Sequence, residues 1–154
     1  EIVAGVIHEV GYNESFYAWK DSPAYLNGKE IRVSDTPKVA DSLIGTGFPY
    51  TNFTYLSGFM ESVEYFMEHS HGLRRLGSAA TDIAYLACGR FDAFYEYGLK
   101  PWDVAAGILI VQQARGRIRD FEGGDDYLFG GEIIASNAAI FDELRPLVRK
   151  LIKG

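Results

Sequence analysis

The first part of the chain shows the apolar and polar alternation that is typical of β-strands. An apolar-rich run covers residues 2–10, and an aromatic-rich run follows at 15–20. Asn27 and Gly28 come next, and this pair favours a type I′ hairpin turn, which needs positive φ at both central positions. We therefore expect residues 1–34 to form an antiparallel meander.

After a polar break at residues 34–37, the apolar residues recur at steps of three and four, as they do on one face of a helix. This spacing predicts a helix from about residue 54 to 71, and Gly72 suits a left-handed cap at its end. Ser78 is a favoured N-cap residue and predicts a second helix that runs to about residue 89.

The last third of the chain continues this mixture of strands and helices. A third helix is expected from Asp103 to about Ala114, and a fourth after Ser136-Asn137, where Pro146 would kink or split it. Short strands are expected near residues 42–47, 91–97, 117–121 and 132–135. The alternation predicts an α/β fold with a boundary at the polar break.

Composition narrows the possible classes of function. The 154 residues are 47% hydrophobic, which suffices for a substantial core, and the net charge is -6. Because the only basic pairs are Arg74-Arg75 and Arg149-Lys150, we expect no nucleic-acid partner. The single cysteine, Cys88, excludes a disulfide within the chain. No apolar stretch approaches a membrane span and no signal peptide is present, so we expect no membrane partner and a cytoplasmic location.

The most specific stretch surrounds Asp103, which comes directly before a predicted helical turn of small residues, Ala105, Ala106 and Gly107. Small residues let a helix start approach another backbone or a ligand closely. The Asp103 carboxylate has two possible roles here. It can cap free backbone amides, which periodicity alone favours, or it can bind a hard cation that meets a phosphate.

Two further features have both a structural and a functional interpretation. Glu96, at the end of a predicted strand, is either a solvated acid or an acceptor for substrate hydroxyl groups near Asp103. Gly77 and Ser78 begin the second helix, where exposed amides favour oxygen-rich or anionic ligands. The structural alternative is an ordinary Ser78 cap with Asp82 in the first turn.

Together these motifs resemble the second half of inositol monophosphatases. The matching segments, in order, are Leu76–Ala80, Ala87–Asp92, Glu96 and Pro101–Gly107. The tryptophan–aspartate pair with its small-residue helix start is that family's C-terminal signature, and the first strand and the hairpin match as well. The resemblance implies part of a layered α-β-α-β-α sandwich of the sugar phosphatase type. Residues 1–34 would be the remnant of a first sheet, and residues 37–154 an α/β subdomain with a second sheet.

The resemblance also implies roles for individual residues. Asp103 matches the family's metal-binding aspartate, which helps to hold a catalytic Mg²⁺. Glu96 matches a glutamate that accepts hydrogen bonds from inositol or sugar hydroxyl groups. Gly77, Ser78 and Ala79 match the backbone positions that line the substrate pocket.

One departure from the family pattern matters for activity. The family's first motif, an Asp-Pro-Ile-Asp-Gly-Thr-like segment with most of the metal ligands, would lie upstream of Glu1. Since Glu1 is not methionine and already begins a strand, we expect a fragment cut from a larger protein, although removal of a tag is the alternative. One carboxylate is a poor Mg²⁺ site, so we expect this chain to be inactive alone.

For the parent protein, the resemblance implies magnesium-dependent hydrolysis of inositol monophosphate or a similar polyol or sugar phosphate monoester. Fructose-1,6-bisphosphatase-like and nucleotide 3′-phosphatase-like enzymes are alternatives within the enzyme class, and a non-catalytic assembly module is an alternative outside it. The expected partner is a small phosphorylated polyol or sugar. A divided sheet leaves an unpaired edge and apolar surface, so we also expect a homo-oligomer, namely a dimer.

Overall fold

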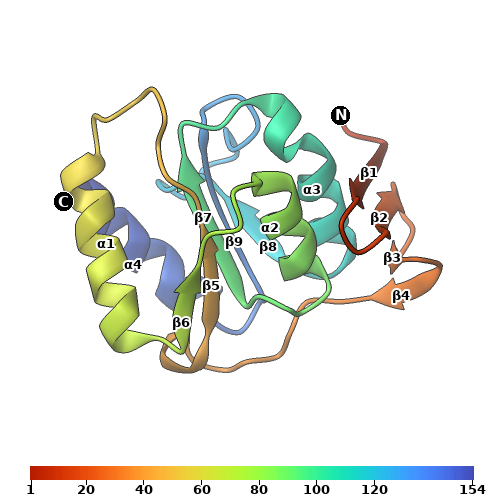
Figure 1. Ribbon diagram of the computed structural model, residues 1–154, viewed down its shortest axis with the longest axis horizontal. Helices are drawn as coiled ribbons and strands as arrows, with labels where there is room; N and C mark the ends of the chain where they lie inside the picture. Colours follow the sequence, from red (N-terminus) through yellow and green to blue (C-terminus); the bar gives the residue numbers. More distant parts are fainter.

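The computed structural model describes residues 1–154, and it consists of two β-sheets and four α-helices in alternating layers (Figure 1). A four-stranded sheet forms one outer layer, and α2 and α3 lie between it and a five-stranded sheet. Helices α1 and α4 cover the other face of the five-stranded sheet. The mixed α/β class that the sequence predicts is confirmed.

The first sheet is the predicted meander, with strands in the order β1-β2-β3-β4 and every pair antiparallel. At the tip of the third hairpin, between β3 and β4, Asn27 has φ 47° and Gly28 has φ 82°, as the type I′ turn requires. The strands are β1 (Ala4–Glu9), β2 (Glu14–Trp19), β3 (Ala24–Leu26) and β4 (Lys29–Ile31). The division of the chain into separate units at residues 34–37 stays a prediction.

The second sheet has the order β6-β5-β7-β9-β8. Strand β5 is parallel to both of its neighbours, whereas β9 is antiparallel to β7 and β8. The strands are β5 (Leu43–Thr46), β6 (Gly72–Arg74), β7 (Ala93–Tyr97), β8 (Arg117–Arg119) and β9 (Glu132–Ser136). Because β5 and β7 are parallel, their carboxyl ends lie at the same edge of the sheet.

Edge strand β6 was not predicted, and the expected role of Gly72 was wrong. The preceding helix ends at Ser70, whose backbone is extended and whose amide bonds to the Phe66 carbonyl. Gly72 has φ +147° rather than the value near +60° of a left-handed cap, and it begins β6. A strand of three residues is too short to show a periodicity of its own.

The four helices are α1 (Leu56–His69), α2 (Ala79–Ala87), α3 (Pro101–Gln113) and α4 (Phe141–Lys153), with a short 3₁₀ turn at Val39–Asp41. Helix α3 begins at Pro101, two residues before the predicted start, because proline suits the first helical position. Pro146 does not split α4, which continues through it. No helix in the structure is both long and apolar enough to cross a bilayer.

The alternation along β7 assigns its side chains to two different cores. Tyr95 and Tyr97 belong to the core shared with α1 and α4, whereas Phe94 belongs to the core around α2 and α3. Glu96 has the parity of Phe94, so its side chain points toward the α2 and α3 layer. This places a carboxyl group at the sheet edge, on the side where those two helices begin.

Small residues bring this middle layer close to its neighbours. A Cβ atom on Gly5 of β1 would lie 2.8 Å from the carbonyl oxygen of Ala106, and one on Gly107 would lie 2.5 Å from the Ile83 side chain. The expectation that the small-residue start of α3 allows close backbone approach is therefore confirmed. These contacts fix the first turn of α3 against both β1 and α2.

Candidate active site

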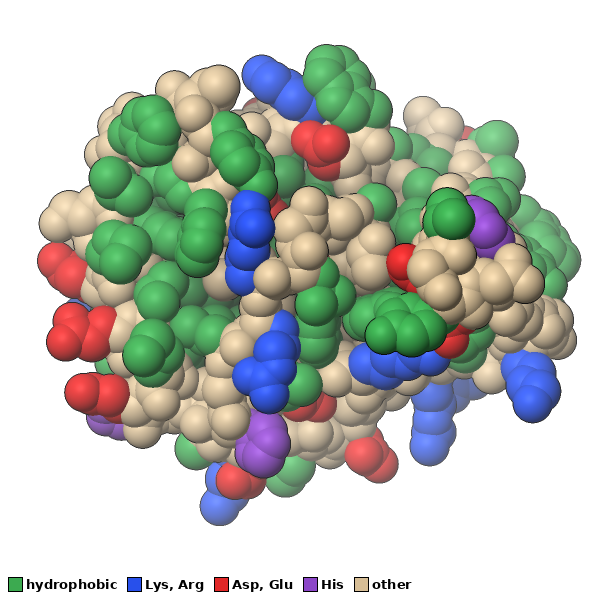
Figure 2. Space-filling model, in the orientation of Figure 1, with side chains coloured by type: hydrophobic (Ala, Val, Ile, Leu, Met, Phe, Trp, Pro, Cys, Tyr) green, Lys and Arg blue, Asp and Glu red, His purple; other side chains and the backbone are tan.

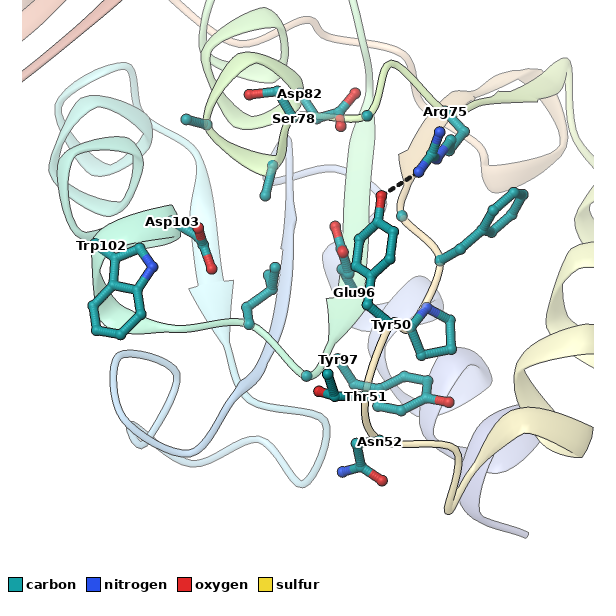
Figure 3. A pocket seen from close by; sticks show the side chains of 18 residues that line it. Tyr50, Thr51, Asn52, Arg75, Ser78, Asp82, Glu96, Tyr97, Trp102 and Asp103 are labelled. Atoms are coloured by element: carbon teal, nitrogen blue, oxygen red, sulfur yellow. Dashed lines mark hydrogen bonds between the residues drawn. The ribbon is translucent and has the colours of Figure 1, made fainter.

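A cavity of about 370 Å³ opens at the sheet edge where β5 and β7 end, between the first turns of α2 and α3 (Figure 3). Its size lies within the range of small-molecule sites. The residues that line it are Gly47–Asn52, Arg75, Gly77–Ala80, Asp82, Glu96–Leu99, Trp102 and Asp103. The position follows the general rule that α/β sheets bind ligands beyond the carboxyl ends of their strands.

The first turn of α2 forms one wall. Gly77 has φ +90°, a left-handed conformation that turns the chain into the helix. The Ser78 hydroxyl accepts a hydrogen bond of 3.3 Å from the Thr81 amide, so the predicted N-cap is confirmed. The amides of Ala79 and Ala80 have no partner within the helix, and both residues line the cavity. This wall therefore offers two hydrogen-bond donors at the positive end of a helix dipole.

Asp103 lies in the first turn of α3 and caps it. One carboxylate oxygen, Oδ2, accepts a hydrogen bond of 2.9 Å from the Lys100 amide. The other oxygen, Oδ1, takes part in none of the hydrogen bonds, and the side chain is directed toward the cavity (Figure 3). The cap that periodicity favours thus exists, and it leaves one oxygen available to a ligand.

Glu96 is the second-to-last residue of β7, and it is only 7% exposed. Burial raises the pKa of this carboxyl to about 8, and the negative charges of Asp82 and Asp103 add to the effect. The Arg75 guanidinium acts in the opposite direction. Glu96 is therefore a buried carboxyl that is mostly protonated at neutral pH, rather than the solvated strand-end acid of the structural alternative.

Asp82 is a second buried carboxyl in the wall, one turn along α2 from Ser78. It is 1% exposed, and neither of its oxygens has a hydrogen-bond partner. Burial raises its pKa to about 7. The Leu76 backbone amide, which lies nearby but outside hydrogen-bond geometry, and the charge of Arg75 offset a part of that rise. The sequence presents Asp82 as an ordinary first-turn acid, so its burial could not be anticipated from its position alone.

Arg75 is the only cationic side chain that lines the cavity. Its guanidinium donates a hydrogen bond to the Tyr50 hydroxyl, as Figure 3 shows, and lies 5.0 Å from the centroid of the Phe48 ring. Cation–π contacts of this kind hold the group at the rim. The cavity therefore combines one cation with three carboxyl groups, of which two are buried.

The metal-ligating side chains of this chain do not by themselves form a magnesium site. No three acidic, histidine or cysteine side chains are grouped closely enough to hold a metal ion. Asp103 offers one free oxygen, whereas Mg²⁺ requires near-octahedral coordination by oxygen. These residues alone therefore do not provide a complete coordination shell for a magnesium ion.

The structure brings all the residues that the sequence singled out into one place. Asp103, Glu96, Gly77, Ser78 and Ala79 line the same cavity, although they come from three different elements. The sequence did not identify the remaining wall, which consists of Asp82, Arg75 and the segment Gly47–Asn52. The glycine and the proline of that segment are typical of a loop. That the loop lies beside the end of β7 follows only from the order of the strands in the sheet.

Comparisons with known proteins agree with this geometry. The sequence pattern described as the inositol monophosphatase family matches residues 1–153. The chain is 39% identical over 150 residues to an inositol-1-monophosphatase of Mesorhizobium japonicum, which covers 97% of this chain and 56% of the relative. It is 41% identical over 133 residues to the Nus factor SuhB of Pseudomonas aeruginosa, which covers 85% of this chain and 49% of the relative.

Solved structures show the same similarity. The extragenic suppressor protein suhB of Bartonella henselae matches with a TM-score of 0.87 and 38% identity, over 98% of this chain and 57% of the other. An IMPase of Thermotoga maritima matches with a TM-score of 0.87 and 35% identity, over 97% of this chain and 57% of the other. The chain thus spans about half the length of the relatives it matches.

Proposed function

Because the chain belongs to the inositol monophosphatase family, we propose that it supplies the polyol-binding wall of a magnesium-dependent phosphomonoesterase site. The observation that carries the proposal is the single cavity that unites Asp103, Glu96 and the start of α2. The substrate is an inositol monophosphate or a similar polyol or sugar phosphate monoester.

Each wall of the cavity has a role that suits such a substrate. Glu96 accepts hydrogen bonds from ring hydroxyl groups, since it is buried beside the cavity and its carboxyl oxygens need donors. The amides of Ala79 and Ala80 donate to an oxygen of the ligand at the helix start. Asp103 Oδ1 is one ligand of the metal site in the complete protein.

The charges of the lining favour a monophosphate over a bisphosphate. Arg75 is the sole cation, whereas Asp82, Glu96 and Asp103 are acids. A second phosphate on the substrate would find no further cationic partner in this chain, because Arg75 is the sole one in the lining. This argues against the fructose-1,6-bisphosphatase-like alternative.

The chain alone is expected to lack activity, because the ligands that would complete a magnesium site are not among its 154 residues. We propose that polypeptide outside these residues provides them in the whole protein. That protein would be a hydrolase, and its cofactor would be Mg²⁺.

The first prediction tests this proposal at Asp103. In the protein that contains this chain together with its complementing polypeptide, Asp103→Asn should lower Mg²⁺-dependent phosphate release from myo-inositol 1-phosphate at least about 100-fold, as expected for a lost interaction of about 2.7 kcal/mol in the transition state. The asparagine oxygen still accepts from the Lys100 amide, so the thermal midpoint should remain near that of the wild type.

A matched variant separates the cap from the chemistry. Asp103→Ala removes both functions and should also lower the free energy of unfolding by about 1 kcal/mol. Wild-type activity in Asp103→Asn would contradict the proposed role of this carboxylate. Phosphate release by the 154-residue chain alone, with Mg²⁺, would contradict the proposal that the site is completed from outside.

A further inference from the structure

Gly47 directly follows β5, where the chain leaves the sheet and passes across the end of β7. Its φ lies outside the left-handed region, so the backbone at this position does not require glycine. Most of the other residues in this turn carry side chains, and several are exposed. The absence of a side chain at position 47 therefore needs another explanation.

That explanation is the carboxyl group of Glu96. A Cβ atom on Gly47 would lie 2.2 Å from Cδ, Oε1 and Oε2 of Glu96, far inside the contact distance of real Cβ atoms. No backbone atom is among the three nearest atoms. The space that a side chain would fill at position 47 is thus occupied by one carboxyl group.

Shape, rather than hydrogen bonding, keeps that carboxyl in place. The raised pKa of Glu96 comes from burial and nearby charges, and no hydrogen bond to the carboxyl group is among its causes. The two backbones are fixed relative to each other, because β5 pairs with β7 and the Thr46 hydroxyl donates a hydrogen bond of 2.8 Å to the Tyr95 carbonyl. The bare backbone of Gly47 is therefore the surface against which Glu96 lies.

We propose that Gly47 is a positioning residue that lets the Glu96 carboxyl lie at the cavity wall, where it accepts hydrogen bonds from the hydroxyl groups of a polyol phosphate. The inference rests on the proposed function, since it assigns Glu96 to the ligand. It identifies position 47 as a determinant of specificity for hydroxylated ligands, although Gly47 itself donates no side chain to them.

The substitution Gly47→Ala tests this proposal in the 154-residue chain. The new methyl group meets the end of a flexible side chain and no backbone, so the fold should persist, with the thermal midpoint lowered by less than about 4 °C. The Glu96 carboxyl should move, and the affinity for myo-inositol 1-phosphate should fall at least about tenfold. Nuclear magnetic resonance titration measures the affinity, and a crystal structure of the variant locates the carboxyl.

Second-site variants distinguish positioning from a general structural effect. In the Gly47→Ala background, Glu96→Asp shortens the side chain by one methylene, makes room for the new methyl group and should recover part of the affinity. Glu96→Gln keeps the length and should recover none. Gly45→Ala, two residues earlier, is the control for a clash in the core, because its Cβ would lie 2.9 Å from the Phe91 ring.

The outcomes separate the inference from the proposed function. Wild-type affinity in Gly47→Ala, or equal recovery by Glu96→Asp and Glu96→Gln, would overturn the inference. If the wild-type chain binds no myo-inositol 1-phosphate at all, the proposed function fails. The crystal structure of Gly47→Ala then decides the positioning claim by itself, and an unmoved Glu96 carboxyl would overturn it.

Discussion

Asp82 and Glu96 are two buried carboxyl groups that accept no well-formed hydrogen bond. The Asp82 oxygens are fully enclosed, whereas Glu96 lines the cavity. Burial raises the pKa of Asp82 to about 7 and that of Glu96 to about 8. Buried polar groups without partners cost free energy of folding, and they are typical of sites that a ligand completes. Hydroxyl groups of a polyol in the cavity would provide hydrogen-bond partners for Glu96.

This pair leads to a prediction about stability and pH. The pKa values of the folded state lie above those of the unfolded chain, 3.8 for Asp82 and 4.5 for Glu96. Between these limits the folded state binds more protons, so the free energy of unfolding should fall as pH rises from about 4 to 8. A shift of about three pH units corresponds to about 4 kcal/mol for each group. Denaturant unfolding at a series of pH values measures this slope.

The matched variants for that measurement are Asp82→Asn and Glu96→Gln, which keep the shape of each side chain and remove its titration. Each should flatten the decrease of stability above pH 4.5 relative to the wild type. The difference from the wild type removes the contribution of other groups, such as Glu14, whose pKa the Arg90 hydrogen bond lowers. An unchanged slope in both variants would show that these carboxyls titrate normally.

At the residue level, the sequence predicted the part of the site that lies in local motifs. Asp103, Ser78 and Glu96 stand at element ends, where residue type and neighbours carry information. Asp82 and Gly47 were not identified as site residues, because their surroundings arise from strand pairing over long sequence separations. The roles of all these residues in catalysis stay predictions.

Among the elements, the contact between β1 and α3 is the one that fixes the helix start beside the cavity. Gly5 lies against the backbone of Ala106, a residue of α3 that follows Asp103 by three positions. No flexible side chain can yield at this contact. The packing of the first sheet therefore influences the position of the candidate metal ligand.

We predict that Gly5→Ala lowers the free energy of unfolding by about 2 kcal/mol, because the added methyl group meets backbone atoms at 2.8 and 2.9 Å. Val6→Ala, at the next position, is the control; its side chain is 66% exposed, and its effect should stay within about 0.5 kcal/mol. Denaturant unfolding monitored by circular dichroism measures both. Equal stability of the two variants would show that β1 does not pack closely on α3.

The elements themselves were largely predictable from periodicity and capping. The meander, the cap at Ser78 and the alternation of strands with helices follow from patterns within short windows. The start of α3 and the strand β6 did not follow. Pro101 determines the start of α3 locally. Strand β6 is defined only by its pairing with β5, so no short window of sequence predicts it.

The whole molecule has two exposed apolar regions that lie far apart. On the outer face of the first sheet, the rings of Tyr17, Trp19 and Tyr25 stack at centroid distances of 5.4 to 6.5 Å. On the opposite side, hydrophobic side chains gather over α1 (Figure 2), including Met60 and Met67, which are 54% and 67% exposed. Apolar surface of this extent favours association.

We predict that the 17.1 kDa chain self-associates through the outer face of the first sheet. Multi-angle light scattering should give a mass of at least twice the monomer, and Trp19→Lys should restore the monomer. Val10→Lys, at a position that is 80% exposed but lies in the turn after β1, should leave the mass unchanged. A monodisperse wild-type monomer would contradict this prediction.

At the same scale, the chain covers about half of each relative and holds a cavity whose acids and amides suit a polyol phosphate. Its layers match those of 57% of each solved structure, and 18 residues of this chain line the cavity. We propose that this cavity binds the substrate, while the remaining ligands of the metal site come from elsewhere in the protein.

A titration of the ¹⁵N-labelled chain with myo-inositol 1-phosphate, followed by nuclear magnetic resonance up to about 10 mM ligand, tests that claim most directly. We expect saturable shift changes at the amides of Gly47, Ala79, Ala80 and Glu96, and their loss in Glu96→Ala. Shift changes confined to another surface, or no change over the whole range, would contradict it.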